Sequence, residues 1–152
     1  MNPHRLHRVL FACIAAILAT ALAFAGFASV TLPDSPVPVV WDKASCAHCR
    51  MHLGEPPFAA QMVLRDGTVA MFDDPGCLFQ FAADEPREVH ATWFHQLRGD
   101  GWISAAEVAF VAVEATPMGF GLGAVPRATA GAIDLATARD RCLHPRNEGV
   151  RR

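Results

Sequence analysis

The sequence has no excess of positive charge. Its 152 residues include 13 lysines and arginines against 15 aspartates and glutamates, which gives a formal net charge of -2. Proteins that bind nucleic acids usually carry a basic surface, so this composition argues against nucleic acid as a partner. The chain is also too short for two full domains. We therefore expect one small globular domain behind an N-terminal extension.

Charge is absent from most of the N-terminal segment. Met1 to Arg8 is short and basic, and the stretch from Val9 to Leu32 is apolar and uncharged. This pattern predicts an export signal, and the apolar run is also long enough to span a bilayer. We interpret residues 1–32 as a cleaved signal peptide or an uncleaved transmembrane anchor. Both place the remainder in the periplasm, attached in the second case to the outer face of the cytoplasmic membrane.

Proline and turn residues divide the rest of the chain. Residues 33–40 are rich in proline and should form an extended spacer. Residues 41–145 have the composition of a folded domain, and residues 146–152 form a short tail. No internal repeat is clear enough to indicate duplication.

The first part of the domain predicts a β-hairpin followed by a helix. Residues 58–65 and 68–72 are expected to form two strands, because the Asp66-Gly67 pair between them suits a tight turn. Asp73-Asp74-Pro75 supplies capping oxygens and a proline for the first turn of a helix over residues 75–83.

The second part predicts further short elements. We expect a strand at residues 89–95, a short helix opened by the capping box Ser104-Ala-Ala-Glu107, a strand at 110–114, and a final helix at 127–141. Hairpins that alternate with short helices indicate an α+β domain.

The clearest chemical motif is Cys46-Ala-His-Cys-Arg-Met51, which places four potential metal donors close together. Thiolates and thioethers are soft ligands that favour copper(I), whereas zinc rarely uses methionine. In extended backbone, Cys49 and Met51 point to the same face and can share one ion. Cys46 can join them only if residues 47–48 form a turn. The motif predicts a copper(I) site on Cys49 and Met51, assisted by Cys46.

Other sulfur atoms give weaker signals. Met118 lies in a glycine-rich segment that leaves room for an ion or a partner protein, which by itself is weak evidence for a ligand. Cys77 follows a predicted helix start, where amide dipoles favour a thiolate, but packing beneath the hairpin is the favoured interpretation. A disulfide between Cys77 and Cys142 is left open.

Two alternatives compete with copper binding. A Cys-x-x-Cys pair at Cys46 and Cys49 is typical of thiol-disulfide oxidoreductases, although Pro56 and Pro57 would stop a helix starting at the motif early. The other alternative is an interaction domain stapled by zinc or disulfides through its cysteines. Because no catalytic pair emerges, we expect a protein that is not an enzyme.

Four ordered segments resemble the NosL family, whose members are copper-binding accessory proteins of nitrous oxide reductase. They are Cys46-Ala-His-Cys-Arg-Met51, Ala60-Gln61 with Asp66-Gly67, Phe72-Asp-Asp-Pro-Gly-Cys77, and Thr116-Pro-Met-Gly-Phe-Gly121, which lie within residues 41–125. Arg50 departs from the family pattern, because it replaces the usual glycine.

The resemblance implies a fold of two ββα-like units, similar to that of the organomercurial lyase MerB. It maps the family's copper ligands onto Cys49, Met51 and Met118. It also implies a copper chaperone that delivers copper(I) to apo nitrous oxide reductase or another copper enzyme during denitrification or a related process, together with an ABC-type transporter complex.

Overall fold

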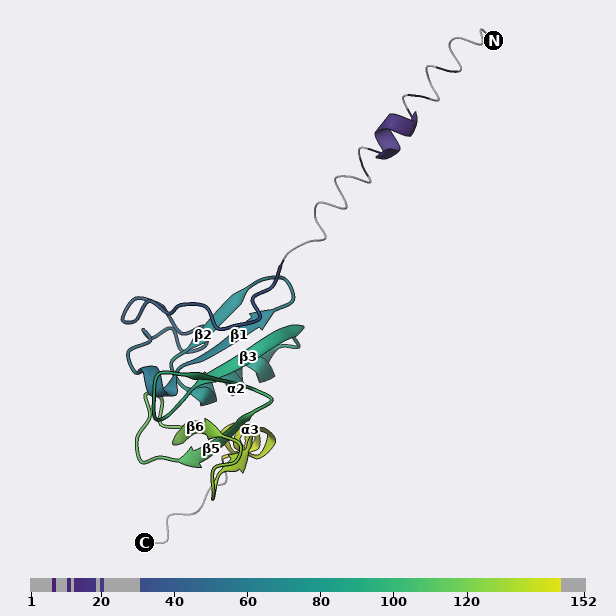
Figure 1. Ribbon diagram of the computed structural model, residues 1–152. Coiled ribbons are helices and arrows are strands. Elements are labelled where there is room, and N and C mark those ends of the chain that lie inside the picture. Colours follow the sequence, from purple (N-terminus) through teal and green to yellow (C-terminus); the bar gives the residue numbers. More distant parts are fainter. Residues whose placement is uncertain (1–6, 8–10, 12, 19, 21–30, 146–152) are drawn as a thin grey trace. The chain divides into compact units, whose positions relative to one another are not determined.

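The computed structural model describes residues 7, 11, 13–18, 20 and 31–145 (Figure 1). The chain divides into two compact units, residues 1–31 and 32–152. The described positions between residues 7 and 20 are helical, and no helix among the described residues is long and apolar enough to cross a membrane. Most of the predicted signal or anchor at 1–32, and the whole tail at 146–152, lie outside the described residues.

The first sheet contains the predicted hairpin. Strands β1 (Ala60–Leu64) and β2 (Val69–Phe72) are antiparallel, with Ala60 opposite Phe72. Gly67 in the turn has a φ of 89°, and the Asp66 carboxylate accepts a hydrogen bond from the Thr68 N–H at 2.8 Å. Asp66 and Gly67 therefore form the turn as predicted, and the hairpin is confirmed.

Two more antiparallel strands complete the first sheet. Strand β3 (Val89–His95) pairs with β1, and β4 (Trp102–Ser104) pairs with β3, which gives the order β2-β1-β3-β4. The predicted strand at residues 89–95 is confirmed with the same bounds.

Helix α2 (Pro75–Asp84) confirms the predicted helix at residues 75–83. Asp74 is its N-cap, and the Oδ1 atom accepts a hydrogen bond from the Gly76 N–H at 2.9 Å. Pro75 occupies the first turn, where its missing N–H has no intrahelical partner to lose. The start of the helix is buried from Pro75 to Phe79.

The second sheet is smaller. Strands β5 (Val108–Ala112), β6 (Leu122–Pro126) and β7 (Ile133–Asp134) are antiparallel in the order β6-β5-β7, and helix α3 (Leu135–Leu143) follows. A single 3-10 turn, η1 (Pro56–Phe58), precedes β1. The α+β class is confirmed. Two strands followed by a helix occur first as β1-β2-α2 and again as β5-β6 with α3, where β7 stands before the helix. Strands β3 and β4 lie between these two units in the chain.

The predicted short helix after Ser104 is wrong. Residues 104–107 form a turn in which the Glu107 N–H donates to the Ser104 carbonyl at 2.9 Å, and the Ser104 hydroxyl donates to the Glu107 carboxylate at 3.3 Å. The capping-box residues thus meet, but strand β5 begins at the next residue and buries Val108. Strand pairing overrides the local helix signal, and the predicted strand at 110–114 starts and ends earlier.

The final helix is shorter than predicted. Residues 127–132 form turns, and Gly131 has a φ of 75°, which a right-handed helix does not allow. Asp134 then caps α3, because its Oδ1 accepts a hydrogen bond from the Thr137 N–H at 2.7 Å. The helix begins at Leu135, eight positions later than residue 127.

Aromatic side chains join the two sheets through α2, which lies between them (Figure 1). The ring centroids of Phe79 on α2 and Phe94 on β3 are 5.9 Å apart, and those of Phe79 and Phe110 on β5 are 5.8 Å apart. Phe94 and Phe110 meet edge to face at 5.1 Å. All are buried, so one core holds both sheets and the helix.

We expect Gly76→Ala to lower the free energy of unfolding. A Cβ atom on Gly76 would overlap the ring of Phe120, so the loop at residues 116–121 would have to move away from α2. Overpacking of this kind costs about 1–3 kcal/mol, more than the roughly 1 kcal/mol by which alanine favours a helix. Urea unfolding of the reduced protein measures the change.

Gly54→Ala is the matched control, because its added Cβ would lie 3.5 Å from an oxygen of Asp42, an ordinary contact. A Gly76→Ala protein as stable as the wild type would show that Phe120 does not pack on the helix.

Candidate metal centre

The Cys46–Met51 segment forms a tight turn closed by backbone hydrogen bonds. Ser45 and His52 form an antiparallel bridge, and the Cys46 N–H donates to the Met51 carbonyl at 2.8 Å. Within the turn, the Arg50 N–H donates to the Cys46 carbonyl at 3.1 Å. The turn that Cys46 needs to approach Cys49 is thus present.

Arg50 is in the left-handed region, with a φ of 68°. Glycine reaches this region without strain, whereas other residues lose about 1–2 kcal/mol there. This conformation gives a physical reason why a glycine suits the position that Arg50 occupies. The side chain is exposed, so the strain is not offset by burial.

Three cysteines meet at this turn. Cys46 and Cys49 come from the turn, and Cys77 comes from the first turn of α2. Their Sγ atoms all lie within 4.8 Å of one another. Cys46 and Cys77 are fully buried, whereas Cys49 is half-buried. We call these three residues the cysteine cluster; it is a compact set of soft donors with one member reachable from solvent.

The cysteine cluster favours a thiolate at Cys46. Hydrogen bonding from the Cys77 thiol, and from the backbone N–H groups of Asp73, Cys49 and His48, lowers the pKa of Cys46 although burial opposes the shift. The same thiol-to-thiolate hydrogen bond, with burial and the negative charge on Cys46, raises the pKa of Cys77. The hydrogen bond between the two sulfur atoms thus lowers the pKa of Cys46 and raises that of Cys77.

Cys49 has a different environment. Burial raises its pKa, and the proximity of Cys46 adds to the increase, while the Met51 N–H opposes it. A bound cation would lower the pKa of Cys49, because positive charge stabilises every thiolate around it. The residues present thus suit a metal ion held by sulfur.

Asp73 holds the adjoining loop against the cysteine cluster. Its carboxylate accepts a hydrogen bond from the Gly54 N–H at 3.1 Å, and its side chain is buried. Burial raises the pKa of Asp73, and the negative charge of Cys46 contributes to the rise. Asp74 is the N-cap, and Asp73, which the sequence offered with it as a source of capping oxygens, instead positions the loop that follows Met51.

The two predicted methionine ligands lie on segments attached to the cysteine cluster. Met51 is 53% exposed and contributes its carbonyl to the turn. Met118 is 37% exposed, and its N–H donates to Oδ2 of Asp74 at 3.2 Å. The N-cap of the helix that carries Cys77 thus fixes the backbone of Met118. Both residues are thus partly exposed, and their role as ligands stays a prediction.

His48 and Cys142 stand apart from the three sulfur atoms. The Nδ1 atom of His48 lies 3.7 Å from a carboxylate oxygen of Asp84, toward the far end of α2. Cys142 is buried on α3, where burial raises its pKa to about 11. All cysteines in the described part of the chain are free, so Cys77 and Cys142 form no disulfide.

Cys77 is the member that sequence reasoning assigned to packing. The signal in the sequence is its position as the third residue of a helix, where amide dipoles favour a thiolate, but in the structure burial and the neighbouring Cys46 outweigh that effect. That α2 starts beside the Cys46–Met51 turn is a tertiary fact, which the local motif does not contain.

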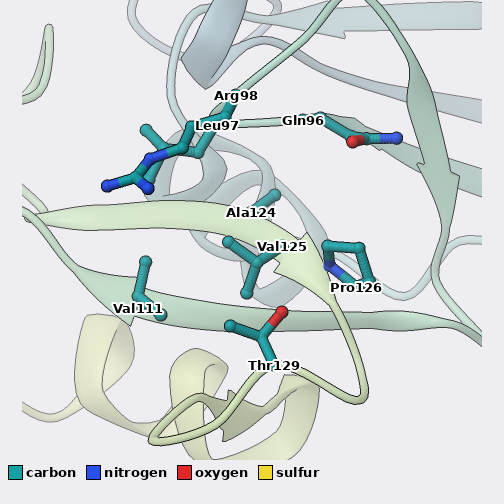
Figure 2. A pocket seen from close by; sticks show the side chains of 8 residues that line it. All are labelled: Gln96, Leu97, Arg98, Val111, Ala124, Val125, Pro126 and Thr129. Carbon is teal, nitrogen blue, oxygen red and sulfur yellow. The ribbon is translucent and has the colours of Figure 1, made fainter.

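A pocket elsewhere in the domain offers no soft ligand. It lies beside β6, where the Leu97 N–H donates to the Ala124 carbonyl at 2.8 Å. Figure 2 shows Leu97, Val111 and Val125 along its wall, with Arg98 extending from its rim. None of its lining residues carries sulfur or an imidazole, so this pocket supplies no soft metal ligand.

Among the comparisons with known proteins, the comparison with solved structures supports this fold. No protein-family model matches the sequence, and no curated protein does either. The crystal structure of the copper chaperone NosL from Shewanella denitrificans is similar, with a TM-score of 0.51. The two chains are 16% identical, and the match covers 74% of this chain and 89% of that one. The NosL-like fold implied by the sequence motifs is thereby confirmed.

We expect Arg50→Gly to raise the free energy of unfolding of the metal-free protein by about 0.5–1 kcal/mol, since relief of the left-handed strain exceeds the backbone entropy that glycine loses. Arg50→Ala removes the same charge but keeps a Cβ atom at the same φ, so it should give no gain. Urea unfolding compares the two variants. Equal gains would assign the effect to the lost charge instead of to the backbone.

Proposed function

We propose that this protein binds copper(I) at the cysteine cluster and delivers it to a copper enzyme. The observation that carries the proposal is the convergence of the Sγ atoms of Cys46, Cys49 and Cys77 within 4.8 Å of one another. The similar fold of a protein described as a copper chaperone supports the same function. Three thiolates form a soft donor set that suits a monovalent, thiophilic ion.

The number of donors favours copper(I) over zinc. Structural zinc sites are closed by four Cys, His or carboxylate ligands, whereas the group found among the described residues has three members. Neither His48 nor Asp73 belongs to that group. Copper(I) accepts a lower coordination number, so the three sulfurs can hold it without a further residue.

Accessibility favours transfer instead of permanent storage. Cys49 is half-buried, and Met51, which follows it closely in the chain, is exposed. Met118 is exposed as well, and its N–H bonds to Asp74, the N-cap of the helix that carries Cys77. In this proposal the methionines are the outer ligands that receive the ion first, and Cys46 and Cys77 hold it below. Thioethers suit this role because they bind copper(I) without being consumed as disulfides.

The proposal is a binding function without catalysis. Its client is nitrous oxide reductase or another copper enzyme, and an ABC-type transporter complex is a further proposed partner. We place the domain in the periplasm, with residues 1–32 as its signal or membrane anchor. These assignments rest on the uncharged N-terminal run and on the motifs shared with NosL-type sequences.

An anaerobic titration of the reduced full chain in detergent with copper(I), against a competing chelator, tests the proposal. We expect one tightly bound ion. Cys46→Ser, Cys49→Ser and Cys77→Ser should each weaken binding by at least about 100-fold, because each removes a direct ligand, and loss of a group that only orients a ligand already costs about 10–100-fold. Met51→Ala and Met118→Ala should weaken it less, by roughly 10-fold.

Cys142→Ser is the matched control, because Cys142 is a buried thiol outside the cysteine cluster. It should leave the affinity unchanged. Binding that tolerates Cys77→Ser but is lost in Met118→Ala would refute the three-thiolate site. A parallel zinc titration that gives the tighter complex would replace copper transport with a structural zinc role.

A further inference from the structure

We propose that the cysteine cluster is also a redox switch, in which a disulfide between Cys46 and Cys49 prevents copper(I) binding and bound copper(I) prevents the disulfide. The inference rests on the proposed function, since copper(I) binding is what the switch controls. It is carried by the unequal exposure of three sulfur atoms that lie within 4.8 Å of one another.

Exposure selects the first cysteine to react. Cys46 and Cys77 have no exposed surface, whereas Cys49 is half-buried. A small disulfide from solution can therefore approach only Cys49 among the three. Access decides which protein thiol attacks, because exchange requires the attacking sulfur to line up with the incoming disulfide.

The fold selects Cys46 as the second cysteine. Cys46 and Cys49 share one turn, closed by the hydrogen bond from the Arg50 N–H to the Cys46 carbonyl at 3.1 Å. Bonding between them needs side-chain rotation within this turn. Cys77 is held differently, because α2 is capped by Asp74 and Gly76 packs beneath the ring of Phe120. A bond from Cys49 to Cys77 would have to pull on the buried start of that helix.

The chemistry proceeds by two exchanges with a low-molecular-weight disulfide as the oxidant. The Cys49 thiolate attacks one sulfur of that disulfide, which forms a mixed disulfide and releases one thiolate. The Cys46 thiolate then attacks the Cys49 sulfur and releases the second thiolate. The two protein thiols lose two electrons in total, and the small disulfide gains them as two thiols.

The product cannot hold copper(I) as the reduced protein does. Two of the three thiolates are consumed in the bond, which leaves Cys77 buried behind it. In the other direction, copper(I) occupies the sulfur lone pairs that would attack the oxidant. Disulfide formation therefore weakens copper(I) binding, and by thermodynamic linkage copper(I) binding disfavours the disulfide in turn.

The test exposes the reduced full chain to oxidised glutathione, with and without stoichiometric copper(I), and follows free thiols and disulfide peptides by mass spectrometry. We expect the cysteine cluster of the metal-free protein to lose two thiols as a Cys46–Cys49 disulfide, and copper(I) to protect both; the exposed Cys13 is counted separately by its own peptide. The oxidised protein should bind copper(I) at least about 100-fold more weakly, as expected when direct ligands are lost. A reductant should restore the affinity.

Variants make the assignment specific. Cys77→Ser and Cys142→Ser should still form the Cys46–Cys49 disulfide, whereas Cys49→Ser should leave Cys46 and Cys77 reduced. A disulfide through Cys77, no protection by copper(I), or full affinity after oxidation would each overturn the switch. Absence of copper(I) binding by the reduced chain would instead refute the proposed function, and the thiol count still shows separately whether the disulfide forms.

Discussion

Asp74 is the residue on which the arrangement of the metal centre depends. It is fully buried, and its two carboxylate oxygens serve different parts of the chain. Oδ1 caps α2 at Gly76, and Oδ2 accepts the N–H of Met118 at 3.2 Å. One side chain thus fixes the start of the helix that presents Cys77 and the loop that carries Met118. A buried carboxylate is tolerated here because backbone donors satisfy both oxygens.

Much of the fold follows from local sequence because turns and caps have specific chemistry. Asp66-Gly67 and the Asp74-Pro75 helix start predicted the first hairpin and α2, and both are present. The capping box at Ser104 failed because Val108 pairs in a sheet, a gain that no local window contains. The last helix begins later than predicted because Gly131 has a positive φ. Composition alone does not indicate that φ.

The site was predictable only in part. Soft-ligand chemistry indicated Cys46 and Cys49, and the structure brings their sulfur atoms together. Cys77 was assigned to packing because its 28-residue separation from Cys49 gives no distance in space, and only the docking of α2 beside the turn supplies that distance. Met51 and Met118 are exposed, and their thioethers remain predicted copper ligands.

X-ray absorption at the copper edge tests the central claim most directly, because it counts the atoms around the bound ion. For the copper(I)-loaded full chain, the account predicts a shell dominated by sulfur, from which Cys77→Ser removes one sulfur while Cys142→Ser removes none. A shell unchanged by Cys77→Ser, or one dominated by nitrogen and oxygen, would contradict the claim that three cysteines form the metal site.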